Sequence, residues 1–307
     1  MKFIVLGAGA VGSYLITKLA VAGHTVETVV SKRSNKRHIE NEGIELFSKD
    51  KRFIVKVPCY VYEDLKDIES DYLIIATKSH EAMRILDEIP ERRFSFSYIV
   101  TLQNGAEVHL KASKIFGEDH LILSVREGVY AFDVHKVRHI GDGSIPNIVT
   151  SLSASRESID SFVDILSKSN IPVVASYDGK RVIYEKLIIN SIINPVATLL
   201  RVKNGFLLRM LNTNGILNLL EEALKVVALE GIHINPIEIQ DNLRKVLQST
   251  SENRCSMLQD LEQKKKTEIE YINGYLLKLA KKHGMELRTH EIIYELILRL
   301  EEAYGTH

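Results

Sequence analysis

The stretch Lys2-Phe-Ile-Val-Leu-Gly-Ala-Gly-Ala-Val-Gly12 decides the fold, because an apolar strand runs directly into a glycine-rich turn. Its glycines have the spacing G-x-G-x-x-G, and the periodicity of residues 11–22 predicts that a helix follows. In such a βαβ unit the glycines permit the tight turn, the approach of a pyrophosphate and close helix packing, and the helix N-terminus favours phosphate. A purely structural turn is the alternative. We predict that the following residues bind a dinucleotide: Gly7, Ala8, Gly9, Ala10, Val11 and Gly12.

Up to about residue 175, short apolar runs alternate with amphipathic stretches. Strands are expected at 2–6, 24–30, 71–76, 97–102 and 120–125, and helices at 11–22, 80–88 and 107–115. This alternation predicts a parallel sheet covered on both faces. Residues 129–148, which include Gly141 and Gly143, are expected to add antiparallel strands at the edge of that sheet. A helix at 156–168 and a strand at 171–175 then close the domain.

Beyond Gly179 the pattern becomes helical. Apolar residues recur every three or four positions at 182–200, 214–230, 236–248, 267–283 and 290–304. The change occurs near Tyr177-Asp178-Gly179. We therefore predict an α/β Rossmann-type dinucleotide-binding domain over residues 1–177, followed by an all-α C-terminal domain over residues 178–307.

Composition argues against several classes of protein. The 307 residues contain 40 Lys and Arg against 40 Asp and Glu, and this balance disfavours a nucleic-acid partner held by a global basic field. Cys59 and Cys255 form no CxxC or Cys/His pattern, which disfavours a zinc site or disulfide framework. The N-terminal apolar run stops at Gly7, too early for a signal peptide, and residues 187–200 are interrupted by polar residues and a proline. We expect a soluble, cytoplasmic protein with no membrane partner.

The end of the second expected strand bears on the choice of cofactor. An NAD enzyme usually carries an acidic residue there for the ribose 2′-hydroxyl, but this chain reads Val29-Val30-Ser31-Lys32-Arg33. Two cations suit a 2′-phosphate, so we predict NADP(H), with two solvated surface cations as the alternative. Glu27 lies inside the strand and is not expected to reach the ribose. Lys78 and Asn104 follow the next two parallel strands, where ligands bind in open α/β folds.

Polar residues in the helical half suggest the chemistry. Lys186, Asn190 and Asn194 recur at every fourth position of an otherwise apolar helix and share one face. Burying an ammonium and two amides requires compensation, so a wet cleft between the domains is the economical explanation; an exposed polar face is the alternative. In a second cluster, residues 253–274, Ser256 could be only a helix cap and Glu268 only a first-turn acid.

These motifs resemble the ketopantoate reductases (2-dehydropantoate 2-reductases) along the whole chain. The resemblance rests on GAGAVG, Thr77-Lys78, Gln103-Asn104-Gly105, Gly128 with Gly141-Asp142-Gly143, Glu185-Lys186-Leu187 with Asn190, Asn194-Pro195, Ala197-Thr198 and Asn204-Gly205, and Ser256-Met257-Leu258-Gln259-Asp260 with Thr267 to Gly274. Two departures stand out. Ala106 and Glu107 follow where the family often has a further glycine, and the family's arginine at the second strand aligns best with Lys32, with Arg33 beside it.

The resemblance implies NADPH-dependent reduction of the C2 ketone of 2-dehydropantoate to (R)-pantoate, a step toward pantothenate and coenzyme A. It implies that Lys186 is the catalytic lysine, which we take as the general acid, and that Glu268 is the second catalytic or substrate-binding group. Residues implied to bind substrate are Asn104, Asn190, Asn194, Asn204, Asn253 and Ser256. Residues implied to contact the cofactor beyond the glycine turn are Lys32, Arg33, Lys78, Asn104 and Glu268.

Hydride transfer to a ketone creates an alkoxide, which Lys186 can stabilise and protonate, so no metal is required. Two other functions remain open: an NADP-dependent reductase of another branched 2-keto acid, or a nucleotide-binding sensor without turnover. A homodimer is also compatible with the apolar helical domain.

Overall fold

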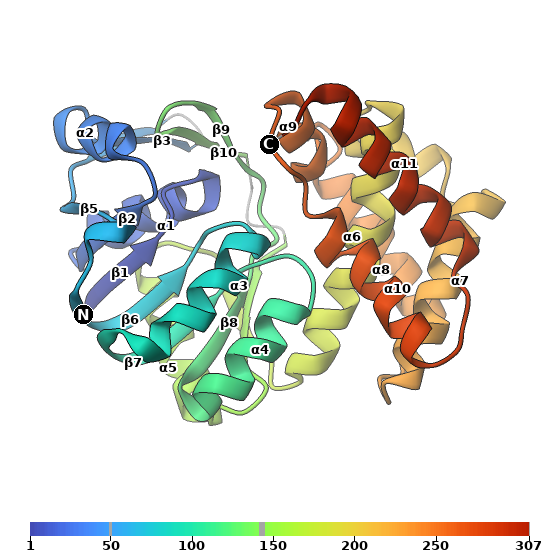
Figure 1. Cartoon of the computed structure of the whole chain (residues 1–307), viewed down its shortest axis with the longest axis horizontal. Coiled ribbons are helices and arrows are strands. Elements are labelled where there is room, and N and C mark those ends of the chain that lie inside the picture. Colours follow the sequence, from blue (N-terminus) through green and yellow to red (C-terminus); the bar gives the residue numbers. More distant parts are fainter. Residues whose placement is uncertain (49–50, 141–144, 307) are drawn as a thin grey trace. The chain divides into compact units, whose positions relative to one another are not determined.

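The computed structural model describes residues 1–48, 51–140 and 145–306 (Figure 1). Gly141, Asp142 and Gly143, which belong to one of the family motifs, lie outside these ranges. The chain forms two compact units. The first contains Met1–Gln103 and Val108–Gly179, and the second contains Asn104–Glu107 and Lys180–His307. The short segment Asn104–Glu107 therefore groups with the helical unit, although the chain on both sides of it belongs to the first.

An eight-stranded sheet forms the centre of the first unit. Its order is β12 (Val173–Ala175), β11 (Asn147–Thr150), β8 (His120–Ser124), β7 (Arg93–Thr101), β6 (Asp67–Ile75), β1 (Lys2–Leu6), β2 (Thr25–Val30) and β5 (Cys59–Val61). The six neighbouring strands β8, β7, β6, β1, β2 and β5 are parallel, and β11 pairs antiparallel with β8. The chain moves outward from β1 in both directions, so the carboxyl ends of β1 and β6 form the switch point of a doubly wound sheet.

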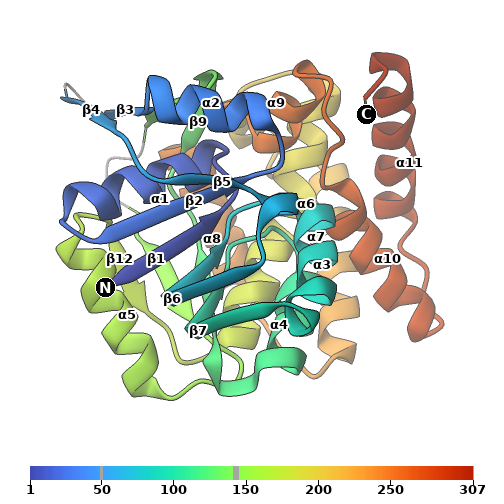
Figure 2. The same ribbon diagram turned by 60° about the vertical axis from the view of Figure 1, so that its left-hand side comes forward.

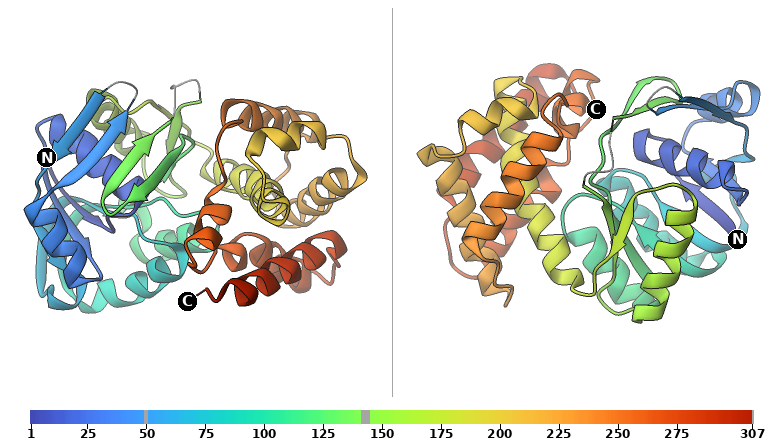
Figure 3. Two further views of the ribbon diagram at one scale, coloured as in Figure 1. Left: turned by 90° about the horizontal axis from the view of Figure 1, so that it is seen from above. Right: turned by 180° about the vertical axis from the view of Figure 1, so that it is seen from behind.

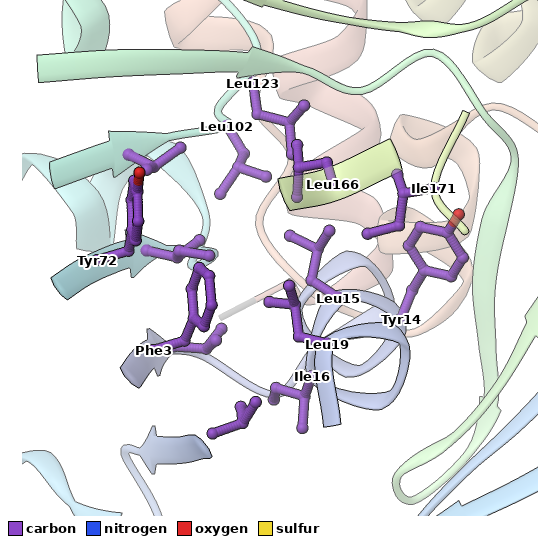
Figure 4. Close-up of a cluster of buried hydrophobic side chains, with 14 of the residues drawn as sticks. Phe3, Tyr14, Leu15, Ile16, Leu19, Tyr72, Leu102, Leu123, Leu166 and Ile171 are labelled. Carbon is purple, nitrogen blue, oxygen red and sulfur yellow. The ribbon is translucent and has the colours of Figure 1, made fainter. Parts of the chain in front are cut away.

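Helices cover both faces of this sheet, as predicted from the buried strands (Figure 2). They are α1 (Ala10–Val21), α2 (Arg33–Asn41), α3 (Ser79–Glu88), α4 (Glu107–Phe116) and α5 (Arg156–Lys168). On β1, alternate side chains serve opposite faces. Phe3 lies in one cluster with Leu15 of α1 (Figure 4), and Phe162 of α5 belongs to the same cluster. Ile4, on the other face, lies in a cluster with Ile85 of α3.

A second sheet corrects one prediction. Its order is β4 (Lys51–Val55), β3 (Ile44–Ser48), β10 (Lys136–His139) and β9 (Val129–Asp133) (Figure 3). The expectation that residues 129–148 extend the edge of the large sheet was wrong for β9 and β10, and only β11 joins that sheet. The reason is that β3 offers β10 a parallel partner, and that Leu46 and Val137 bury their side chains in the same cluster as Leu15 of α1.

The second unit is helical. It contains α6 (Gly179–Leu200), α7 (Asn214–Leu229), α8 (Pro236–Ser249), α9 (Ser256–Glu262), α10 (Asn273–Lys282) and α11 (Arg288–Tyr304). The expected helix at 267–283 was wrong in its first turns, where a short 3-10 helix covers Ile269–Tyr271. The Thr267 hydroxyl accepts the Ile269 N–H and offers the backbone an alternative to helix formation. Within the described ranges, no helix has the length and apolar character required to cross a membrane.

Candidate active site

The glycine turn after β1 has the geometry that its sequence predicts. Gly7 has a φ of +105°, which only glycine adopts readily, and an added Cβ would lie 3.1 Å from the carbonyl of Ala76. At Gly12 an added Cβ would lie 1.9 Å from the carbonyl oxygen of Gly7. These two glycines therefore bring helix α1, the turn and the end of β6 into close contact.

Gly9 differs, because an added Cβ would meet no atom within 4 Å. It is exposed, and it is the N-cap residue of α1 without a side-chain acceptor for the first N–H groups of the helix. The open space beside Gly9 and the helix N-terminus together fit the pyrophosphate of a dinucleotide.

The tip of β2 carries the two predicted ligands of a 2′-phosphate. Lys32 is the exposed N-cap residue of α2, and the guanidinium of the exposed Arg33 pairs with Asp64 at 2.8 Å. Glu27 pairs with the ammonium of Lys2 at 3.1 Å. The expectation that Glu27 does not serve the ribose stays a prediction. The choice between NADP and NAD stays a prediction.

Gln103 ties the ends of β6 and β7 together. Its side-chain amide donates to the carbonyls of Ile75 at 2.8 Å and Thr77 at 2.9 Å, and its side-chain oxygen accepts the Leu102 N–H at 3.0 Å. The next residue after Thr77 is Lys78, which is half-buried and occupies the N-cap position of α3 without a side-chain capping hydrogen bond. The sequence singled out Gln103 only as part of a motif, although its position at a strand end was the available signal.

Asn104 joins two of the predicted site residues within the second unit. Its side-chain amide donates to a Glu268 carboxylate oxygen at 3.0 Å, and its side-chain oxygen accepts from the Asn190 amide at 3.1 Å. Glu268 is buried, with 6% of its surface exposed, and stands at the start of a 3-10 helix. The structure therefore brings together a carboxylate and two amides from three separate parts of the chain.

The segment that carries Asn104 also contacts the helical unit through its neighbours. Gly105 has a φ of +88°, and an added Cβ would lie 2.1 Å from the Tyr271 carbonyl oxygen. The Lys278 ammonium lies 3.5 Å from a Glu107 carboxylate oxygen and 2.9 Å from one of Glu270. Burial alone would raise the pKa of Glu270, but hydrogen bonds from a tyrosine and from Lys278 hold it below its usual value. Glu107, a departure from the family pattern, thus takes part in fixing this segment.

The polar face of α6 is not an exposed surface. Asn194 is buried, whereas Lys186 and Asn190 are half-buried. The Asn194 carbonyl accepts from the hydroxyl of Thr198 at 2.7 Å and from the thiol of Cys255 at 3.5 Å. The burial of Asn194 and the partial burial of Lys186 and Asn190 argue against a fully solvated face.

The remaining predicted residues form a second group. Asn204 is buried, and its backbone N–H donates to the Asn253 carbonyl at 2.9 Å. Cys255, and not Ser256, caps α9, because its sulfur accepts the Leu258 N–H at 3.4 Å. Ser256 is exposed at the first helical position, so its interpretation as a cap was wrong. Its role in substrate binding stays a prediction.

Comparison with known families agrees with these motifs. The family model described as ketopantoate reductase PanE/ApbA matches residues 3–146, and the one described as ketopantoate reductase PanE/ApbA C terminal matches residues 178–301. This chain belongs to the ketopantoate reductase family. The predicted family, the predicted fold class and the predicted class of enzyme, an oxidoreductase, are therefore confirmed.

Individual relatives extend the comparison along the whole chain. A 2-dehydropantoate 2-reductase from Bacillus subtilis is 29% identical over 306 residues, covering 98% of this chain and 98% of the relative. A crystal structure of a probable 2-dehydropantoate 2-reductase from the same organism has a TM-score of 0.76 at 26% identity, covering 98% of this chain and 100% of the other. A structure of D-mandelate dehydrogenase with NADH and anilino(oxo)acetate has a TM-score of 0.90 at 23% identity, with both chains fully covered, and shows the shared fold.

Proposed function

We propose that this enzyme uses NADPH to reduce 2-dehydropantoate to (R)-pantoate, with residues 1–177 binding the cofactor and residues 178–307 binding the substrate. The observation that carries the proposal is the hydrogen-bonded set of Asn190, Asn104 and Glu268, in which Asn190 lies one helical turn after Lys186 on α6. The names of the full-length relatives support the same substrate. The product would serve pantothenate and coenzyme A biosynthesis.

Lys186 is the proposed general acid. NADPH, when bound, would supply a hydride to the carbonyl carbon, and the carbonyl oxygen would then need its developing negative charge stabilised. The ammonium of Lys186 stabilises that charge and donates a proton to the oxygen, and acid assistance of this kind contributes about 10²–10⁴-fold to a rate. A half-buried position on α6 limits competition from water for the ammonium.

Glu268 and the amides orient the substrate. One carboxylate oxygen of Glu268 accepts from Asn104, and a carboxylate retains further lone pairs for a substrate hydroxyl. Asn190 and Asn194 add neutral polar groups, which bind an α-keto acid without another charge. The hydroxyl of 2-dehydropantoate gives these groups a partner that simple branched 2-keto acids lack, so it should determine specificity.

Lys32 and Arg33 are the proposed ligands of the 2′-phosphate. Both are exposed at the tip of β2, and the exposed ion pair between Arg33 and Asp64 is of a kind that contributes little free energy. The Arg33 guanidinium can therefore exchange this carboxylate for a phosphate. A phosphate offers more acceptor oxygens and more charge than the carboxylate does.

We also propose a cytoplasmic homodimer. Ile292 and Leu296 lie one turn apart on α11 and expose 60% and 48% of their surfaces, a pair suited to burial against a second copy. Light scattering of the purified protein should give twice the mass of one chain. A mass of 34.8 kDa, that of a single chain, would contradict the dimer.

The deciding experiment follows NADPH oxidation with 2-dehydropantoate and with 2-ketoisovalerate, which lacks the hydroxyl. We expect kcat/KM to favour 2-dehydropantoate strongly, and Lys186→Ala to lower kcat by at least about 10²-fold while NADPH binding stays intact. The exposed Lys180 of the same helix supplies the control, since Lys180→Ala should leave kcat unchanged. Equal turnover of the two substrates would indicate a general 2-keto acid reductase, and NADPH binding without turnover would indicate a sensor.

A further inference from the structure

Three buried side chains form a continuous hydrogen-bonded chain that ends at the backbone carbonyl of Gln103, and four buried residues take part in it. They are Thr101 at the end of β7, Gln103, His109 in α4 and His120 at the start of β8 (Figure 1), and none is more than 5% exposed. The Thr101 hydroxyl lies 2.7 Å from His109 Nδ1 and 2.7 Å from His120 Nε2. His109 Nε2 lies 3.0 Å from the Gln103 carbonyl oxygen.

The direction of each hydrogen bond follows from the donors available. A carbonyl oxygen only accepts, so His109 Nε2 must carry a proton, and in the neutral ring Nδ1 is then an acceptor. With His109 neutral, the Thr101 hydroxyl donates its one proton to that Nδ1 and accepts from His120 Nε2. Burial and the neighbouring His109 lower the pKa of His120 to about 3, which keeps the His120 ring neutral at physiological pH. The chain thus ends in one directed donor, the His109 Nε2–H.

The His109 Nε2–H donor fixes the peptide group that joins Gln103 to Asn104. The carbonyl of Gln103 and the N–H of Asn104 belong to one planar peptide unit, so fixing the carbonyl also fixes the direction in which the chain enters Asn104. The Gln103 side chain fixes the same residue independently through the Ile75 and Thr77 carbonyls. Asn104 then makes its own hydrogen bonds with Asn190 and Glu268.

We infer that His109 is a positioning residue, which orients the Gln103–Asn104 peptide and thereby keeps the Asn104 amide in place for Glu268 and the substrate. For its effect on turnover this inference rests on the proposed function. Thr101 acts one step further back, because its hydroxyl fixes the tautomer of His109. Neither residue needs to touch substrate or cofactor for this role.

The test compares two substitutions of similar size. His109→Gln keeps an N–H donor near the position of Nε2, whereas His109→Leu removes every donor. We expect His109→Leu to lower kcat by about 10–100-fold with little change in the KM for NADPH, and His109→Gln to retain most of the wild-type kcat. Hydrogen exchange over residues 102–112 should be faster in His109→Leu than in both the wild type and His109→Gln.

If His109→Leu does not fold, the pair Thr101→Val and Thr101→Ser replaces it, since valine removes the hydroxyl at nearly constant volume and serine restores it. A His109→Leu enzyme with wild-type kcat and exchange, or equal damage in both His109 variants, would overturn the inference. Exchange is measured without substrate. Failure of the wild type to reduce 2-dehydropantoate would therefore refute the proposed function and leave the positioning role to be decided by exchange.

Discussion

Gly7, Gly9 and Gly12 are glycines for three different physical reasons. Gly7 needs its positive φ, and Gly12 needs the space taken by the Gly7 carbonyl, so both are required by the folded chain itself. Gly9 has neither constraint: its φ is −74° and nothing lies within 4 Å of an added Cβ. A requirement at Gly9 must come from a ligand.

Gly9→Ala should therefore separate binding from folding. We expect thermal stability to stay the same or rise slightly, since alanine fits this backbone and restricts the unfolded chain. The NADPH dissociation constant should rise by about tenfold or more, because the new methyl group occupies the approach of the pyrophosphate. Fluorescence titration with NADPH measures the effect. The control is Gly215→Ala in α7, where an added Cβ also meets no atom, and it should reduce neither the thermal stability nor the affinity for NADPH. Unaltered NADPH affinity in Gly9→Ala would contradict the proposal that the pyrophosphate approaches Gly9.

Gly105 makes the opposite prediction. Alanine there would combine a left-handed backbone with a Cβ 2.1 Å from the Tyr271 carbonyl oxygen, so we expect a loss of about 2–5 kcal/mol of unfolding free energy and a fall in kcat/KM. Gly231 has a similar φ of +76° but open space, so Gly231→Ala should cost only about 1–2 kcal/mol and leave kcat/KM unaltered. Urea denaturation of both variants isolates the effect of the close approach. Equal losses of unfolding free energy in the two variants would show that the backbone at Tyr271 shifts to accommodate the new Cβ without a measurable energetic penalty.

Single residues also show where sequence reasoning ends. The spacing of Lys186, Asn190 and Asn194 predicted a shared face, because helical periodicity is local. The hydrogen bond from Asn104 to Glu268 joins residues 164 positions apart, and only the family resemblance pointed to both. Cys255 as the cap of α9 was missed, since cysteine is an unusual N-cap residue and the pattern of Ser256 pointed elsewhere.

At the scale of elements, buried strands and long helices were predicted well, and the small second sheet was not. β1 agrees with its expected bounds because a continuous apolar run after the first residue leaves little choice. The exposed strand β4 has no such signal, and α2, β3 and β5 were also missed. The pairing of β10 with β3 joins residues about 90 positions apart, so no local pattern could assign it.

A buried carboxylate links three of these elements. The Glu127 carboxylate accepts from Tyr14 of α1 at 3.0 Å and Asn147 of β11 at 3.0 Å, and lies 2.9 Å from Nε2 of His139 in β10. Burial by itself would raise the pKa of Glu127, but these hydrogen bonds outweigh it and hold the pKa below its usual value. The ionised form is thus the one that stabilises the contact of helix α1 with its neighbours.

Glu127→Gln should lower the unfolding free energy by about 1–3 kcal/mol at neutral pH, because an amide cannot accept from all three donors. A lowered pKa in the folded state means that this stabilisation is complete above the unfolded value of about 4.3 and disappears as the pH falls through the lower folded value. The gap between wild type and variant should therefore shrink below about pH 4 in urea denaturation series. Glu252→Gln, which breaks an exposed pair with Lys203, should show no gap at any pH. If the difference in unfolding free energy between wild type and Glu127→Gln grew at acidic pH, the claim that the ionised carboxylate stabilises the fold would be refuted.

At the scale of the whole molecule, chain order explains how motifs that are far apart in the sequence reach one edge of the sheet. Gly7, Lys78 and Gln103 each follow a parallel strand, and those strands, β1, β6 and β7, are consecutive neighbours in the sheet. The carboxyl ends of these strands lie at the same edge of the sheet. Three motifs spread over about 100 residues of sequence therefore reach one edge, although no local sequence pattern links them. The next four residues, Asn104–Glu107, then group with the helical unit and its Glu268. The motif Gln103-Asn104-Gly105 thus spans the boundary between the two units along the chain.

Cofactor binding should stabilise the folded chain even in a variant that has lost its catalytic activity. A ligand at 100 times its dissociation constant adds about 2.7 kcal/mol to the free energy of unfolding, so NADPH should raise the melting temperature of wild type and Lys186→Ala alike. Replacing Lys32 and Arg33 together by alanine should abolish most of the NADPH shift and spare the smaller NADH shift, because only NADPH has the 2′-phosphate. Asp64→Asn is the matched control: it removes the partner of Arg33 and should leave the NADPH shift equal or larger. Scanning fluorimetry at equal concentrations of the two cofactors measures all four proteins. Equal loss of both shifts in the double variant would mean that the tip of β2 supports the fold of the site and does not read the phosphate.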